Sequence, residues 1–154
     1  MRAAADTGDA RSINRLAKMY ERGEGVTRDP AQARALTERA AQRGSRQAMH
    51  NLGVYYAEGE GPQRDLNKAA ENFRRAANRG VADSQFNLGA MAEQGLGGQR
   101  SEREAYYWYS IAGRGGDRDA ASKQRELAAR LPPTEKAAED QRVAAFQPEA
   151  SGDD

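Results

Sequence analysis

A Gly-rich octapeptide occurs three times in the chain at a spacing of 36 residues. It reads GEGVTRDP from Gly23, GEGPQRDL from Gly59 and GLGGQRSE from Gly95. Other residues recur with the same period, namely Leu16, Leu52 and Leu88; Ala33, Ala69 and Ala105; and Ala40, Ala76 and Ala112. Units of this size are too small to bury their own apolar faces, so they stack on their neighbours as a solenoid. The period therefore predicts an elongated array of similar units.

Each unit is predicted to be a pair of antiparallel helices. In the second unit, small and apolar residues recur at helical spacing in two segments, first Ala48, Leu52, Gly53 and Tyr56, and then Ala69, Phe73, Ala76 and Ala77. The small residues allow the two helices to approach closely. We expect an all-α fold, a right-handed α-solenoid of about three helix hairpins with a C-terminal capping helix and a short tail helix.

The Gly-rich loops have two possible roles, a phosphate cradle or a hinge between helices. Asp29, Asp65 and Ser101 precede the second helix of each unit and suit an N-cap, and Ser101 with Glu104 fits a capping box. The glycines before them would end the first helix with positive φ angles. A nucleotide loop needs a preceding strand and a Lys followed by Ser or Thr, and the sequence offers neither. The hinge is favoured.

The repeat sets the expected domain organisation. Residues 1–9 would end a truncated preceding repeat, and residues 10–45, 46–81 and 82–116 would form three repeats. Residues 117–131 would form the capping helix, and residues 132–154 a short helix with a disordered tail. We expect Thr134 to cap that short helix, which would run to about Phe146. Val143 and Phe146 are expected to fold back onto the solenoid, because an isolated short helix is marginal in water.

Composition excludes several classes of function. The 154 residues suit one domain, and a net charge of +1 gives no sign of a nucleic-acid partner. The chain has no cysteine and one histidine, His50, so we predict no metal site, cofactor or catalytic residue. A hydrolase would need a nucleophile beside a base, which the sequence does not offer. No apolar run is long enough to insert in a membrane.

The repeat resembles the Sel1-like repeat, a relative of the tetratricopeptide repeat. The resemblance covers residues from about 3 to 130 and is carried by AMHNLGVYYAEGEG, by SQFNLGAMAEQGLG with YYWYSIAGRGG, and more loosely by SINRLAKMYERGEGVTRDP. Ala17, Ala92 and Gly98 depart from the family pattern. The resemblance implies a non-catalytic scaffold that binds other proteins.

A narrower resemblance is to the PodJ family of alphaproteobacterial polar localization factors. The segments AMHNLGVYYAEG, GVADSQFNLGAMAEQGLG and EAYYWYSIAGRGGDRDAASKQRELAARL resemble its periplasmic C-terminal region. This resemblance implies a periplasmic scaffold domain of a membrane-anchored protein that organises a cell pole. Two alternatives stay open: a peptidoglycan-binding module that uses Tyr107, Arg74, Arg75 and Arg79, or a regulator of a sensor kinase.

Analogy with tetratricopeptide repeats places a partner-binding groove along the first helices of the units. The candidate groove residues, expected to receive a protein or a peptide, are Asn14, Lys18, Glu21, His50, Val54, Phe86, Ala90 and Glu93. The alternative is a solvated surface without a partner. Trp108 and Tyr109 are expected to be packing residues, and Tyr107 is a candidate exposed aromatic anchor.

Overall fold

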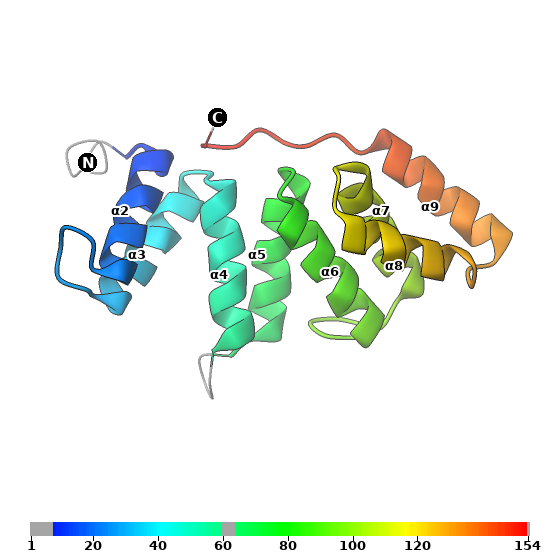
Figure 1. The fold of residues 1–154 in the computed structure, drawn as a ribbon, viewed down its shortest axis with the longest axis horizontal. Coiled ribbons are helices and arrows are strands. Elements are labelled where there is room, and N and C mark those ends of the chain that lie inside the picture. The colour runs from blue at the N-terminus through cyan, green and yellow to red at the C-terminus, as the bar shows by residue number, and fades with distance from the viewer. Residues whose placement is uncertain (1–7, 60–63, 154) are drawn as a thin grey trace.

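The structure, a computed structural model, describes residues 8–59 and 64–153 (Figure 1). Within these ranges the chain forms eight α-helices and no β-strand, which confirms the all-α prediction. The helices are α2 (Ala10–Arg22), α3 (Pro30–Gln42), α4 (Arg46–Glu58), α5 (Leu66–Asn78), α6 (Ala82–Gln94), α7 (Glu102–Arg114), α8 (Arg118–Ala128) and α9 (Pro133–Ala145). None of these helices has the length and apolar character needed to cross a membrane. Residues 1–7, most of the predicted end of a preceding repeat, lie outside the described ranges.

Six helices pair into three hairpins that stand side by side along the molecule (Figure 1). The helix α2 packs on α3, α4 on α5, and α6 on α7. Both α8 and α9 also pack on α7. We call α2, α4 and α6 the A helices, and α3, α5 and α7 the B helices. The helix α8 takes the position of a further A helix and closes the core at that end.

Recurring alanines form the contact between the helices. Ala40, Ala76 and Ala112 have no exposed surface. Because an alanine side chain is a single methyl group, the backbones on either side can approach closely. Larger buried side chains such as Leu52 and Phe73 fill the space between these contacts. The result is a thin layered core that continues from one hairpin to the next.

The loops between A and B helices are structural hinges. The side chains of Asp29, Asp65 and Ser101 accept the backbone N–H three residues further on at 3.0–3.1 Å, as predicted for N-caps. The capping box at Ser101 is only half formed. The Ser101 N–H donates to the Ala92 carbonyl at 2.8 Å, so the Glu104 carboxylate is free to pair with Arg142 at 2.9 Å.

Positive φ angles end two of the three A helices. Gly23 and Gly95 have φ angles of 71° and 75°, which glycine adopts without a steric penalty. Gly59 departs from the prediction, because its φ is −60° and it ends α4 in an extended conformation. The three glycine repeats are therefore similar in sequence but do not all adopt one turn.

The last helix differs in its start from the prediction. It begins at Pro133 with Pro132 as N-cap, not Thr134, and no side chain caps it. Proline suits the first helical position because its missing N–H would have no partner there. Val143 and Phe146 pack against the core cluster that contains Trp108, as expected for a helix that folds back.

The segment after α9, for which the composition predicts disorder, lies against the hairpin array in this structure. Residues 147–151 form no helix or strand and run back along the array toward α2, and residues 152–153 form a turn (Figure 1). The Glu149 N–H donates to the Asn78 carbonyl at 2.8 Å, and the Gly152 N–H donates to the Gly44 carbonyl at 2.7 Å. We call residues 147–153 the strap. Its hydrogen-bond partners in the array lie more than 70 residues away in the sequence, so no local pattern predicts these contacts.

Candidate functional site

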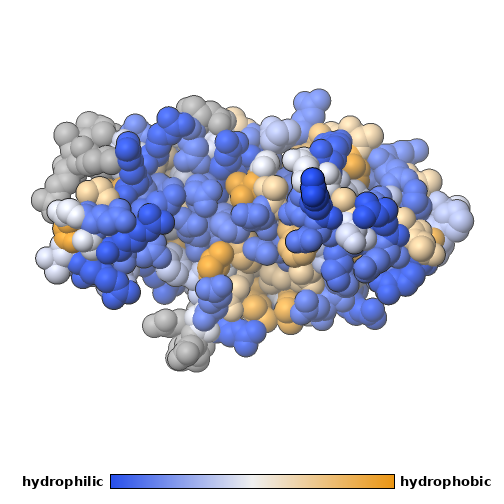
Figure 2. Space-filling model, in the orientation of Figure 1, coloured by the Kyte–Doolittle hydropathy of each residue, from blue (hydrophilic) through white to orange (hydrophobic). Residues whose placement is uncertain are grey.

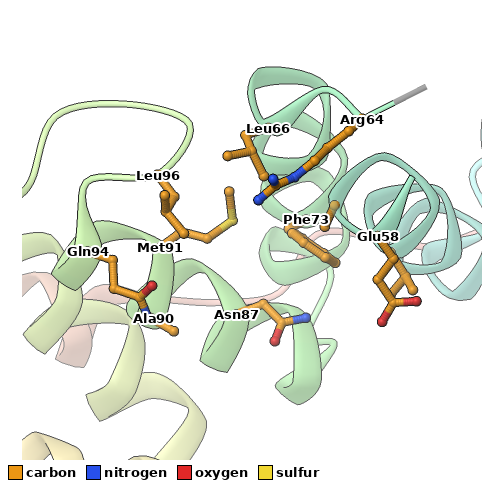
Figure 3. A pocket seen from close by; sticks show the side chains of 11 residues that line it. Glu58, Arg64, Leu66, Phe73, Asn87, Ala90, Met91, Gln94 and Leu96 are labelled. Carbon is orange, nitrogen blue, oxygen red and sulfur yellow. The ribbon is translucent and has the colours of Figure 1, made fainter. Parts of the chain in front are cut away.

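A groove crosses the A-helix side of the second and third hairpins. Its first part is a cavity of about 270 Å3 between α4 and α6, with Phe73 of α5 among its lining residues. Figure 3 shows Leu66, Met91 and Leu96 gathered on one side of this cavity and the polar ends of Asn87 and Gln94 on the other. We call it the apolar pocket.

The rim of the apolar pocket carries an exposed hydrophobic side chain. Leu96 is 36% exposed, and among the described residues no other large hydrophobic side chain reaches that exposure. Figure 2 shows apolar surface gathered over the lower part of α4 to α6, within a face that is otherwise mostly hydrophilic. Such a patch with a polar surround is typical of a surface that binds another molecule.

The second part of the groove is acidic. A cavity of about 350 Å3 is lined by His50 of α4, Phe86 and Asn87 of α6, and the three carboxylates Asp83, Asp117 and Asp119. Asp117 also caps α8, since its side chain accepts the Ala120 N–H at 3.0 Å. Asp83 and Asp119 are exposed. We call this cavity the acidic pocket, because its lining residues include three carboxylates and neither lysine nor arginine.

Asn87 lines both pockets and makes them parts of one groove. It lies at the middle of α6, partly exposed between the two cavities. An asparagine amide offers both donors and an acceptor, so it can bond a peptide backbone in either polarity. The groove thus has an apolar end, a neutral polar middle and an acidic end.

His50 supports the wall of the acidic pocket. Its Nδ1 lies 2.7 Å from the hydroxyl of the buried Ser84, and its ring lies 5.6 Å from the ring of Phe73. Burial lowers the pKa of the imidazole below its usual 6.5, while the neighbouring Asp83 carboxylate opposes this shift. The side chain is therefore favoured in its neutral form, as a packing and hydrogen-bonding group.

The structure brings together half of the predicted groove residues. Val54 and Ala90 line the apolar pocket, and His50 and Phe86 line the acidic pocket. The remaining four predicted residues line neither pocket; they are Asn14, Lys18, Glu21 and Glu93. Which of the eight contact a partner stays a prediction.

Those other four fall short of the groove for different reasons. Asn14 is buried, with 7% of its surface exposed, so it cannot present a side chain to a partner. Lys18 and Glu21 lie on α2, outside both pockets. Glu93 accepts a hydrogen bond from the Tyr109 hydroxyl at 3.2 Å. The analogy thus placed four of the eight residues beside the two pockets, and the other four lie outside both.

Tyr107 is not the exposed anchor that the sequence suggested. The Arg142 guanidinium of α9 lies 4.0 Å from the centre of its ring, and the Trp108 ring packs edge-on at 4.9 Å. Tyr107 is consequently half-buried beneath α9. Trp108 and Tyr109 are buried, as expected for packing residues.

The basic side chains suggested for polymer binding are largely engaged within the fold. Arg75 donates to the Ala41 carbonyl at 3.3 Å and to the side-chain oxygen of Asn72 at 3.4 Å. Arg79 donates to the Arg75 carbonyl at 2.8 Å. Only Arg74 of the three is exposed.

Sequence reasoning missed the acidic residues of the groove, although a signal was present. Asp83 and Asp119 are 36 residues apart and so occupy one repeat position, as do Asn51 and Asn87. A polar residue that recurs on the A helices without entering the core has no packing role. The acidic pocket could have been found from that pattern.

The comparisons with known proteins agree with this architecture. The family model described as Sel1 repeat matches residues 10–45, 46–81 and 82–117. The chain belongs to the Sel1 repeat family. Proteins with Sel1 repeats typically mediate protein–protein interaction, and the scaffold is generally non-catalytic. No curated protein matches the chain.

Two solved Sel1-type structures are similar to it. A Sel1 repeat protein from Oxalobacter formigenes shares 29% identity at a TM-score of 0.78, over 81% of this chain and 94% of that one. A protective antigen present in uropathogenic Escherichia coli strains, displaying an SLR fold, shares 34% identity at a TM-score of 0.77. That match covers 94% of this chain but 32% of the antigen. The Sel1 array seen here is therefore about one third of the length of that larger protein.

Proposed function

We propose that this Sel1 repeat domain is a non-catalytic interaction module that binds a peptide segment of a partner protein in the groove. The observation that carries the proposal is the continuity of the apolar and acidic pockets through Asn87. A single apolar cavity would suit a small molecule equally well. A groove that changes character along its length fits a chain molecule with different groups at successive positions.

The groove chemistry specifies the peptide. Met91, Leu66 and Leu96 would receive an apolar side chain, since they gather on one side of the cavity, away from the polar ends of Asn87 and Gln94. Asp83 and Asp119 would attract a lysine or arginine close to it in the peptide. Phe86 lies beside these carboxylates and offers an aromatic face to the same cation. The expected ligand therefore pairs an apolar residue with a neighbouring basic residue.

Selection from a peptide library displayed on phage tests this function. We expect enrichment of sequences with a large apolar residue near a lysine or arginine. The double variant Asp83→Lys with Asp119→Lys should lose the preference for the basic residue, and Ala90→Arg should block the apolar pocket. The matched control is Glu71→Lys, which reverses an exposed charge on the B-helix side. Failure to enrich any motif, or the same motif from the double variant, would refute the groove assignment.

A finer proposal concerns the cellular role. We propose that the domain acts in the periplasm as part of a protein that organises a cell pole. The support is the sequence resemblance to the PodJ family, carried by residues such as those of GVADSQFNLGAMAEQGLG. Fluorescence microscopy of the full-length protein, tagged with a fluorophore that matures in the periplasm, should show polar foci. A uniform distribution, or fluorescence in the cytoplasm, would refute this role without affecting the peptide-binding proposal.

A further inference from the structure

The strap binds a surface that the proposed function does not use. We call this surface the turn edge, the side of the array where each B helix turns into the next A helix, at Gly44 and Gly80. Figure 1 shows the strap lying along this edge, from the end of α9 to the first hairpin. The apolar pocket lies further along the A helices, and the acidic pocket lies next to the turn edge, but the residues that line the two pockets do not contact the strap.

The turn edge offers backbone acceptors to an extended chain. The carbonyls of Asn78 and Gly44 accept the strap N–H groups of Glu149 and Gly152. These two donors are three positions apart in the sequence, a separation that an extended chain spans in about 10 Å. This is close to the spacing of packed helices, about 8–10 Å. The spacing of every third N–H group in an extended peptide thus matches the spacing of the turns, so the peptide can form a hydrogen bond with one turn after another.

The turn edge also complements acidic side chains. The Arg79 guanidinium pairs with the Glu149 carboxylate at 3.5 Å. The Gln47 N–H, in the first turn of α4, donates to the Asp153 carboxylate at 3.2 Å, where the helix dipole favours a negative charge. Arg11 completes this end by donating to the Asp153 carbonyl at 2.8 Å. Both acidic side chains of the strap within the described residues are therefore matched by positive or N–H groups.

Small residues make the approach possible. Gly80 faces Pro148, and a Cβ atom at Gly44 would lie 3.2 Å from the Gly152 nitrogen. A Cβ atom at Gly152 would overlap the Arg43 carbonyl oxygen. A bound chain consequently needs glycine at the position that crosses the first turn.

We propose that the turn edge is a second peptide-binding site, selective for an extended acidic segment of a partner protein, and that the strap is its intramolecular occupant. The acceptors, the arginines and the helix N-terminus all belong to the hairpin array and not to the strap. They would serve any chain with a glutamate, a glycine and an aspartate at the strap's spacing. The strap is tethered through α9 and competes at a high effective concentration, so a partner must displace it.

The test uses the full chain with Gly152→Pro, which removes the N–H that Gly44 accepts and adds atoms that overlap Arg43. The probe is a synthetic peptide, QPEASGD, with the sequence of residues 147–153. In an amide NMR titration of the variant, we expect the signals of Gly44, Gln47 and Arg79 to shift. In the unaltered chain the strap occupies the site, so its affinity for the peptide should be at least about tenfold lower than that of the variant.

Two controls identify the site and its chemistry. Arg79→Glu in the Gly152→Pro background should weaken peptide binding about tenfold, and a peptide with lysine for the glutamate should restore it. Ala90→Arg, which blocks the apolar pocket from a position two turns further along α6, should leave the titration unchanged, so that this result is independent of the proposed function. The proposal is overturned if the peptide shifts no turn-edge amide, shifts those of the unaltered chain equally, or binds regardless of the charge at position 79. Dimer formation that occupies the turn edge would also overturn it, by assigning the site to a second copy.

Discussion

At the scale of single residues, one position of the repeat shows why the family pattern varies. Gly53 and Gly89 of the A helices face the rings of Phe73 and Tyr109 on the B helices. In the first repeat the equivalent positions hold Ala17 and Thr37. A Cβ atom at Gly53 or Gly89 would lie within 2.7 Å of the ring carbon atoms. Threonine is smaller than either ring, which is why alanine is accepted at position 17.

Gly89→Ala should destabilise the domain by about 2 kcal/mol, because the buried Tyr109 ring cannot move away from the added methyl group. The better helix propensity of alanine offsets part of that cost. The measurement is the free energy of unfolding in urea. Gly98→Ala is the matched control, since no atom lies within 4 Å of a Cβ atom there. Equal stability of the two variants would contradict the close-contact explanation.

A buried polar atom gives a second prediction at this scale. The Asn14 side-chain oxygen is buried without a hydrogen-bond partner. His50 occupies the same repeat position and bonds Ser84, but the residue equivalent to Ser84 in the preceding repeat is Ala48. Ala48→Ser should therefore stabilise the domain by about 1 kcal/mol by supplying the missing donor. The gain should vanish in an Asn14→Ala background, and a gain of equal size there would rule out this bond.

The only histidine predicts a pH dependence. Burial lowers the pKa of His50 in the folded state, so the unfolded chain, with a pKa of about 6.5, takes up a proton first as the pH falls. The free energy of unfolding should hence decrease between about pH 6.5 and 5, above the range in which carboxylates titrate. Urea titrations at several pH values would measure it. His50→Gln should remove the decrease, and a decrease that persists in this variant must come from another group.

At the scale of helices, short-range sequence patterns correctly predicted the helix N-caps and the pairing of neighbouring helices. The N-caps at Asp29 and Asp65 and the pairing of helices follow from short-range spacing, and the structure confirms them. The strap, the covered Tyr107 and the acidic pocket depend on contacts between distant segments. Arg142 covers Tyr107 from 35 positions away, and no periodicity of either segment reveals that contact. The helices and their pairing were thus predictable from the repeat, whereas contacts between distant side chains were not.

The helix α9 is attached to α7 by ion pairs and hydrogen bonds. Glu139, its only buried residue, is 3% exposed and bonds Arg103 at 3.1 Å and Arg142 at 2.5 Å. Glu139→Ala should loosen α9 by roughly 1–3 kcal/mol, because both guanidinium groups lose a charged acceptor. Amide hydrogen exchange should then accelerate in α9 and not in α4. Glu135→Ala, which removes a more exposed carboxylate 3.9 Å from Arg103, should have little effect. Acceleration throughout the array would indicate a global change and contradict this local role.

At the scale of the whole molecule, the strap joins segments that a repeat array normally keeps apart. In such arrays each unit contacts only its neighbours, and the terminal units are the least protected. Here Arg11 of α2 bonds the carbonyl of Asp153, a contact across 142 positions. We predict that Gly152→Pro accelerates amide exchange in α2 by about tenfold while leaving α6 unchanged, since the variant removes the strap from the first hairpin. No change in α2 would mean that the strap adds nothing to the stability of the terminal repeat.

The strap also gives the array a preferred direction of bending. Stacked hairpins flex at their junctions, and the stretch from Glu149 to Gly152 can span no more than about 11 Å, since each residue reaches at most about 3.6 Å. Attached near Gly44 and near Asn78, the strap resists any motion that spreads these two turns apart, but it can slacken when they approach. The molecule should therefore curl readily toward the strap and stiffly away from it.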